Sequence, residues 1–154
     1  MVLIAAIGVA SAATVTVGDL ARRRAAEEQL LFVGKQYIRA FLDYEMNTPD
    51  GSGSRAPSRL ADLLRDPRQP GVKRYLRQLY PDPITGKLDW ELVSAPGGGV
   101  MGIKSRSCAP TIRQRFIDGD WMYLDGRKRY CDWTFAYVIA CGANCITTER
   151  PEQE

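Results

Sequence analysis

The sequence predicts an α+β fold in which one long N-terminal α-helix packs on a small antiparallel sheet of three to four strands. Two observations support this prediction. No helix-breaking residue interrupts residues 19–46, which continue an uncharged run that starts at residue 2. Beyond residue 87, short runs alternate between apolar and polar residues and are separated by glycine-rich turns. At 154 residues the chain has room for one ordinary domain.

The helix is expected to have two halves of different character. Residues 2–18 carry no charge, and the residues that follow place apolar side chains close to the spacing of one helical face, with charged residues between them. A continuous helix to about residue 46 would be about 65 Å long, too long to be buried whole in so small a domain. The apolar face consists of Leu20, Leu30, Leu31, Val33, Gly34, Tyr37, Ile38, Phe41 and Leu42.

These halves suggest a division of the chain into three parts. Residues 1–20 form an apolar half of the helix for a membrane or a filament core, and residues 21–46 form the amphipathic half. Residues 47–154 form a globular head that the amphipathic half completes.

The apolar run fits a membrane anchor better than a cleaved secretory signal. Its 17 uncharged residues span about 25 Å, a little less than the hydrocarbon core of a bilayer, which is about 30 Å thick. Its many small residues favour close packing between helices. A signal peptide would explain Ala10-Ser11-Ala12 as a cleavage site, but no basic residue precedes the run.

The second half of the chain reads as loops, short helices and strands. Residues 47–57 have the composition of an exposed loop, and residues 97–99 are three glycines suited to a turn between two strands. In the last predicted strand Cys131, Trp133, Phe135, Tyr137 and Ile139 share one face. The predicted elements are short helices over residues 59–65, capped by Ser58, and 71–79, and strands over residues 88–94, 100–105 and 130–140.

The cysteines indicate disulfides. All four lie in the last third of the chain, and their even number fits two bridges. Three pairings are open, of which we expect Cys108 with Cys131 and Cys141 with Cys145. A zinc site is less favoured because only the last two have ligand-like spacing. Disulfides predict an oxidising compartment such as the bacterial periplasm.

Three stretches resemble a known family. Residues 22–40 read RRRAAEEQLLFVGKQYIRA, residues 71–90 read GVKRYLRQLYPDPITGKLDW, and residues 132–135 read DWTF. They are similar to the patterns E-x-L-L-F-x-G-x-Q-Y-x-x-A, G-x-x-R-Y-L-R-x-L-Y-x-D-P-x-T-G-x-x-x-W and S-D-W-x-F of type II secretion pseudopilins, which belong with the type IV pilins. The details look closest to the major-type subunits. The resemblance covers roughly residues 20–137.

The resemblance implies a structural subunit. Such a protein is expected to be a single-pass protein of the bacterial inner membrane with a periplasmic head, and to assemble with copies of itself and with other pseudopilins into a short filament for protein export. Glu27 or Glu28 would pair with Arg22, Arg23 or Arg24 of a neighbour. The residues expected to serve assembly on the helix are Leu20, Glu27, Glu28, Leu30, Leu31 and Tyr37.

The N-terminus departs from the family pattern. Pilin precursors carry a short basic leader that ends in glycine, followed by a phenylalanine and, a few residues later, a glutamate. The chain opens with Met1-Val2-Leu3-Ile4 and has none of these. We expect Met1 to be an internal position, either of a longer reading frame or of a longer chain that was cut; otherwise the protein is a divergent subunit.

Enzymatic and nucleic-acid-binding functions are not expected. The chain has no histidine, and it contains no phosphate-binding loop, dinucleotide fingerprint or nucleophile elbow. A formal net charge of +3, from residues spread along the chain, is weak for a nucleic-acid binder. We therefore expect no small-molecule substrate and no cofactor. The one candidate metal site is a calcium loop with Asp118, Asp120 and Asp125, because calcium prefers oxygen ligands.

One alternative comes from a different class of protein. The chain could be a secreted, disulfide-braced binding domain of the periplasm, released by signal cleavage, with its amphipathic helix folded against its own sheet. Retention in the membrane distinguishes the two, because only the filament subunit keeps its apolar run.

Overall fold

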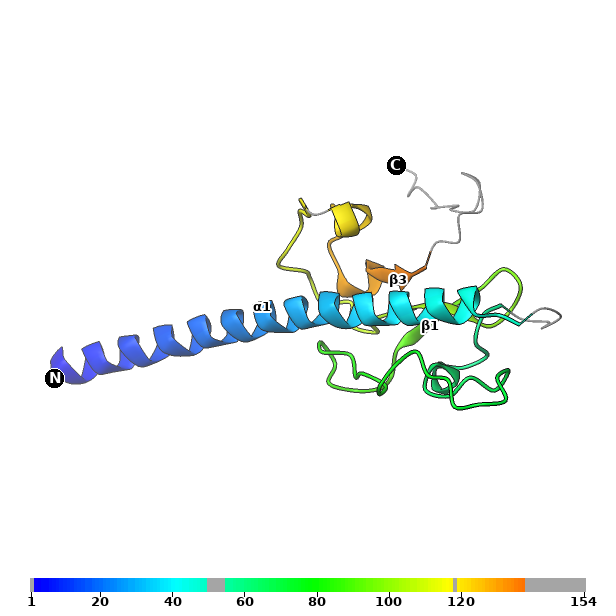
Figure 1. Cartoon of the computed structure of the whole chain (residues 1–154). Helices are drawn as coiled ribbons and strands as arrows, with labels where there is room; N and C mark the ends of the chain where they lie inside the picture. Colours follow the sequence, from blue (N-terminus) through cyan, green and yellow to red (C-terminus); the bar gives the residue numbers. More distant parts are fainter. Residues whose placement is uncertain (1, 50–54, 118, 138–154) are drawn as a thin grey trace.

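A single long helix dominates the structure. The computed structural model describes residues 2–49, 55–117 and 119–137, with side chains from residue 18 onward. Helix α1 (Val2–Met46) has 45 residues and is therefore about 68 Å long. Its N-terminal half extends away from the head, and its C-terminal half lies along the head (Figure 1). The predicted helix is thus confirmed together with its bounds.

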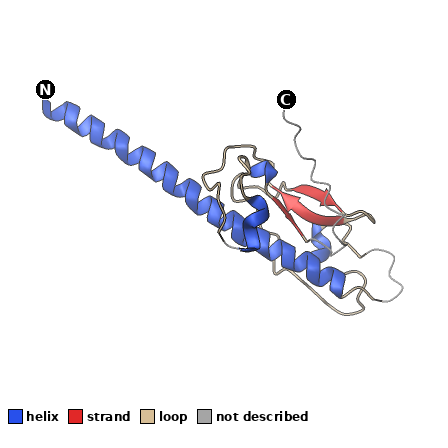
Figure 2. Ribbon diagram, turned by 90° about the horizontal axis from the view of Figure 1, so that it is seen from above, coloured by secondary structure: helices blue, strands red, loops and turns tan. Residues whose placement is uncertain are grey.

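The sheet lies against one side of α1 (Figure 2). Its order within the described residues is β1-β2-β3, and both pairings are antiparallel. Between β1 and β2, Gly98 and Gly99 have φ of 87° and 86°, a backbone conformation that glycine adopts without strain. The predicted α+β layout is therefore confirmed. The strands are β1 (Glu91–Ser94), β2 (Val100–Lys104) and β3 (Thr134–Ala136).

The core forms where α1 faces the sheet. Trp133, Phe135 and Tyr137 are buried, as the alternating pattern predicts. The ring of Phe135 lies directly over Gly34, where any side chain would overlap it, so this glycine lets the helix approach the sheet closely. On the helix, the core residues include Leu30, Val33, Tyr37, Phe41 and Tyr44.

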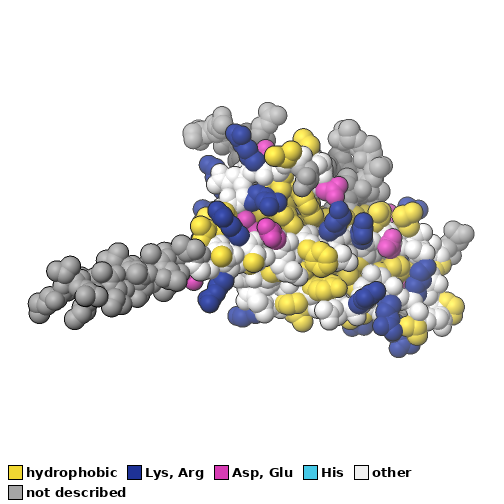
Figure 3. Space-filling model, turned by 60° about the vertical axis from the view of Figure 1, so that its left-hand side comes forward, with side chains coloured by type: hydrophobic (Ala, Val, Ile, Leu, Met, Phe, Trp, Pro, Cys, Tyr) yellow, Lys and Arg dark blue, Asp and Glu magenta, His cyan; other side chains and the backbone are white. Residues whose placement is uncertain are grey.

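The predicted apolar face of α1 is only partly buried. Leu20 and Leu42, which the sequence pattern places on the apolar face, are 43% and 41% exposed. They share the exposed side with Phe32, which is 53% exposed. Apolar side chains also remain exposed over the head, interspersed with charged ones (Figure 3). The buried face of the helix is therefore narrower than the apolar face that the sequence pattern predicts.

The two predicted short helices are largely wrong. In place of a helix over residues 59–65 there is one 3-10 turn, η1 (Leu60–Leu63), which begins after Arg59, not after Ser58. Residues 71–79 form no helix, because the amide of Tyr75 donates to the carbonyl of Leu63 and the carbonyl of Lys73 accepts from Asp66. Pairing with the preceding segment replaces the local hydrogen bonds that a helix would need.

The first and last strands are shorter than predicted. Leu88 and Leu92 are 60% and 46% exposed, so the alternation expected over residues 88–94 fails, and only Trp90 is buried. Its indole N–H donates to the carbonyl of Tyr80 at 2.8 Å, which fixes the ring independently of any strand.

The last predicted strand is also interrupted. Its first residues form the 3-10 turn η3 (Tyr130–Asp132), because Cys131 is held in a disulfide. Residues 138–140, and with them Ile139, lie outside the described part of the chain.

A buried carboxylate fixes the turn between the helical half and the sheet. Asp82 is fully buried, and it accepts hydrogen bonds from the amide of Ile84 at 2.9 Å and from the hydroxyl of Ser105 at 2.6 Å. Gly86 completes the turn with φ of 72°. The turn is therefore attached directly to the residue that follows β2.

A second buried carboxylate, that of Asp66, holds the arginine that binds the C-terminal end of α1. Asp66 receives two hydrogen bonds of 2.9 Å from the guanidinium of Arg68 and one of 2.8 Å from the hydroxyl of Tyr75. The same guanidinium donates to the carbonyl of Tyr44 at 2.7 Å and lies over its ring. A cation at a helix C-terminus is favourable because the last carbonyls lack intrahelical partners.

The first prediction concerns the contact between α1 and the sheet. Gly34→Ala should lower the free energy of unfolding by about 1–3 kcal/mol, because the new methyl group collides with the ring of Phe135. Gly18→Ala is the control, since no atom lies near that position and alanine favours a helix. Urea unfolding measures both. Equal stability of the two variants would contradict the close approach.

The second prediction concerns acid stability. Burial alone would raise the pKa of Asp66, but hydrogen bonds from Arg68 and Tyr75, with the charge of Arg68, hold that pKa below its ordinary value of 3.8. Such a carboxylate stabilises the folded state above its unfolded-state pKa, and the stabilisation is lost as the pH falls through the lower folded-state pKa.

We therefore expect the free energy of unfolding to decrease as the pH falls below about 4. Asp66→Asn should reduce this decrease, whereas Asp43→Asn, on the exposed side of α1, should keep it. Urea unfolding over a series of pH values gives the slopes. Identical slopes in the native protein and Asp66→Asn would rule out the contribution.

Candidate functional site

Glu27 connects α1 to the long loop between β2 and β3. Its side chain is 4% exposed and accepts hydrogen bonds from three groups in that loop. The amide of Ile112 donates at 2.6 Å, the amide of Arg113 at 3.1 Å to the second oxygen, and the hydroxyl of Tyr130 at 2.9 Å. The carboxylate thus replaces the carbonyl groups that these amides would meet in a sheet.

The loop folds back on itself so that these donors converge. The amide of Thr111 donates to the carbonyl of Lys128 at 2.9 Å, and Pro110 forms an isolated bridge with Arg129. Beyond them, η2 (Gly119–Leu124) contributes buried Trp121 and Leu124 to the core. The loop therefore has its own internal hydrogen bonds in addition to its contacts with α1.

The Cys108–Cys131 disulfide closes this loop at its base. The predicted first pairing is therefore confirmed, while Cys141 and Cys145 lie outside the described residues. A bridge across 23 positions is expected to stabilise the folded state by about 3 kcal/mol.

Tyr130 keeps its proton at physiological pH. Burial, and then the hydrogen bond and the negative charge of Glu27, raise the pKa of Tyr130 to about 12, although nearby Arg23 lowers it. The hydroxyl is therefore a permanent donor to the carboxylate. This arrangement suits a structural contact, because both partners are engaged within the chain.

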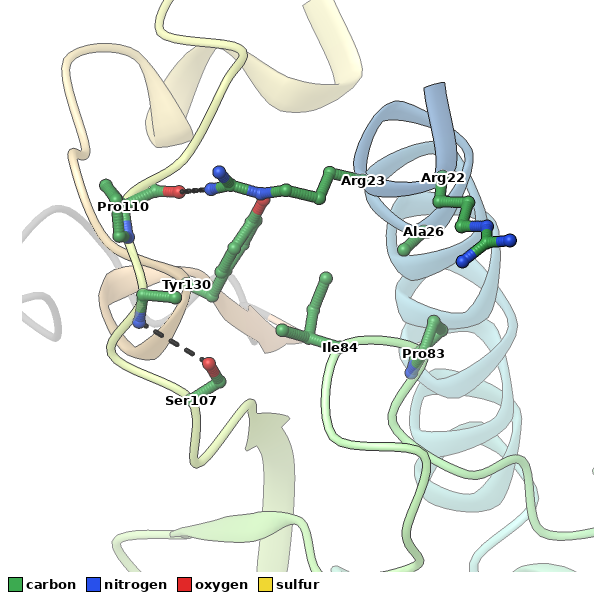
Figure 4. A pocket seen from close by; sticks show the side chains of 9 residues that line it. Arg22, Arg23, Ala26, Pro83, Ile84, Ser107, Pro110 and Tyr130 are labelled. Carbon is green, nitrogen blue, oxygen red and sulfur yellow. Dashed lines mark hydrogen bonds between the residues drawn. The ribbon is translucent and has the colours of Figure 1, made fainter. Parts of the chain in front are cut away.

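A shallow pocket of about 490 Å³ lies beside this contact (Figure 4). Arg23 reaches from α1 towards Tyr130 and donates to the carbonyl of Pro110 at 2.9 Å, whereas Arg22 points the other way. Among the described lining residues, Ser107 has no hydrogen bond to a carboxylate or another base, so the pocket lacks an activated nucleophile. The other walls come from Ala26, Pro83, Ile84 and Ala109.

The predicted assembly residues do not form one surface. Leu30, Leu31 and Tyr37 are buried inside the head, with exposed fractions of 0%, 7% and 0%. The hydroxyl of Tyr37 accepts from the amide of Tyr80 at 3.1 Å. Replacing the two leucines by charged residues would therefore disrupt the core of a single chain before it affected any assembly.

The remaining assembly residues separate in the same way. Glu27 is engaged within its own chain, whereas Leu20 and Glu28 are exposed on α1. Of the two glutamates, Glu28 is thus the one whose side chain a neighbouring arginine can reach.

The predicted calcium residues have other partners. Asp120 forms an exposed ion pair with Lys35, in which Nζ and Oδ2 are 2.6 Å apart. The hydrogen bond and the charge of Lys35 lower the pKa of Asp120. Asp125 accepts from the amide of Phe116 at 3.0 Å. Asp118 lies outside the described residues, and among those described no group of three or more acidic or cysteine side chains is placed to hold a metal ion.

The membrane prediction concerns side chains that the structure does not describe. Within the described part of the chain, no helix meets the length and apolarity needed to cross a bilayer. The side chains of residues 2–17, on which we base the anchor, lie outside that part. The anchor therefore stays a prediction.

The third prediction tests the buried carboxylate. Glu27→Gln should lower the free energy of unfolding by about 2 kcal/mol, because hydrogen bonds to a charged acceptor are replaced by weaker ones and one amide donor is left facing another. Glu28→Gln, one residue away and exposed, should change it by less than about 0.5 kcal/mol.

Urea unfolding gives both values, and hydrogen exchange at the amides of Ile112 and Arg113 should accelerate in Glu27→Gln alone. Similar losses in the two variants, or unchanged exchange, would contradict the contact.

No family model, curated protein or solved structure matches the chain. The resemblance to pseudopilins accordingly rests on residues 22–40, 71–90 and 132–135. It supports a proposal of function.

Proposed function

We propose that the chain is a structural subunit of a pilin-like filament, of the kind that pseudopilins form in type II secretion. The apolar half of α1 anchors it in the bacterial inner membrane, and the head lies in the periplasm. Copies of the chain, together with other pseudopilins, pack through their helices into a short filament that takes part in protein export.

The form of α1 is the observation that carries this proposal. The residues of α1 that the head buries lie between Glu27 and Tyr44, whereas the helix continues N-terminally to Val2. About 25 residues, or about 38 Å, therefore extend beyond the buried part. A domain that functions alone has no use for such an extension, and a helical assembly does.

The exposed side of α1 offers a surface for a neighbouring helix. At about 100° per residue, the four large apolar residues that are exposed between residues 18 and 46 fall within about 120° of one another. Exposed Glu28 and Arg39 lie on the same side, so copies shifted along the helix axis can bring opposite charges together. The four apolar residues are Leu20, Phe32, Leu42 and Met46.

The disulfide supports a location outside the cytosol. Cys108–Cys131 closes a loop on which part of the core depends, and such structural bridges persist in oxidising compartments. A periplasmic head is consistent with this requirement.

The fourth prediction tests membrane retention and self-association together. In cells of its own source the protein should sediment with membranes, and a chemical cross-linker should give a ladder of multimers. Phe32→Glu should weaken the ladder, because it puts a charge into the apolar surface, while changing the free energy of unfolding by less than about 0.5 kcal/mol.

Leu88→Glu is the matched control, since Leu88 is exposed to a similar degree but lies in the segment before β1, outside α1. Its ladder should match that of the native protein. A monomer in the soluble periplasmic fraction, starting near Ala13, would refute the proposal and favour a secreted binding domain.

A further inference from the structure

Basic side chains gather at the end of the head from which α1 emerges. Lys and Arg side chains lie on both sides of the helix at this point (Figure 3). We call this group the basic collar. It consists of Arg22, Arg23 and Arg24 on α1 and of Arg113, Arg127, Lys128 and Arg129 in the loop between β2 and β3, all of them exposed.

Hydrogen bonds bring the loop residues of the basic collar to the helix. Arg23 donates to the carbonyl of Pro110, and the amide of Arg113 donates to Glu27, four residues further along α1. The carbonyls of Arg127 and Lys128 accept from Thr111, at 3.0 Å and 2.9 Å. Two segments of the loop are thus held beside one short stretch of helix.

Acidic residues do not neutralise the basic collar. The exposed acids beside these segments are Asp19, Glu28, Asp125 and Asp132, while the carboxylate of Glu27 is buried and occupied by its three donors. Seven basic residues therefore stand against four exposed acids, although the whole chain is nearly balanced, with 21 basic and 18 acidic residues. The net positive charge of the chain is concentrated here.

The collar side chains also lack partners of opposite charge. The ion pairs within the described residues involve Lys35, Arg59, Arg68 and Lys104, none of which belongs to the basic collar. Guanidinium groups bind phosphate oxygens through two parallel hydrogen bonds, which suits free arginines to a phosphate-bearing surface.

The position of the basic collar identifies that surface. Arg22 follows the last residue of the uncharged run by four positions, or about 6 Å along the helix, which is within one Debye length of about 8 Å at physiological salt. We propose that the basic collar binds the phosphate groups of anionic phospholipids and holds the head against the surface of the bilayer. This inference rests on the proposed function, because the predicted anchor is what brings the basic collar to that bilayer in the cell.

The fifth prediction uses the full chain and two kinds of vesicle. One contains only phosphatidylcholine, and the other also contains about 30% phosphatidylglycerol. Sedimentation at about 0.05 M salt should show binding to both, with a preference of at least tenfold for the anionic vesicles. The preference should decrease at about 0.3 M salt, where exposed charges are screened.

The decisive variant replaces three collar residues whose side chains have no described partner in an ion pair. Arg22→Gln, Arg113→Gln and Arg129→Gln together should reduce the preference by at least tenfold and leave binding to neutral vesicles unchanged, because each basic residue near an anionic surface contributes about 1 kcal/mol. The control removes equal charge near the C-terminal end of α1, where the exposed residues Arg65, Arg74 and Arg77 are replaced by glutamine. It should keep the preference.

The outcomes separate this inference from the proposed function. Equal binding to both vesicles, or an equal effect of the control, overturns the role of the basic collar and leaves the anchor intact. Binding to anionic vesicles alone supports the basic collar and contradicts the anchor. Absence of binding to either kind contradicts both.

Discussion

The buried carboxylate of Glu27 is the contact on which the arrangement of the head depends. Without it, the amides of Ile112 and Arg113 and the hydroxyl of Tyr130 would be buried against α1 with no acceptor. An unpaired buried donor is costly, so docking of the loop on the helix in its present position would be less favourable. The disulfide closes the loop, and Glu27 determines where the closed loop sits.

Sequence patterns predicted the large elements because these depend on local and periodic signals. The absence of proline and the spacing of apolar residues predicted α1, and strict alternation predicted the buried face of Trp133, Phe135 and Tyr137. The same reasoning failed over residues 71–79, where helical spacing was present but Val72 is 69% exposed. There the carbonyl of Leu63, which lies outside the segment, decided the conformation.

Most of the candidate site could not be predicted in this way. Glu27 stands in an amphipathic helix among other charged residues, where a glutamate normally faces solvent, and its donors follow 85 to 103 positions later in a loop without periodicity. The burial of Asp66 and Asp82 could not be predicted either, since short loops rich in polar residues usually leave carboxylates exposed. The cysteine count, by contrast, indicated the one bridge that the structure describes.

The continuity of α1 has a mechanical consequence. No proline interrupts its 45 residues, and the head grips it at two separated points, through Glu27 and through the carbonyl of Tyr44 near its C-terminal end. A pull or a twist applied near Val2 is therefore delivered to the whole head, because no hinge lies between the two parts. The head is therefore expected to move together with the N-terminal end of the helix.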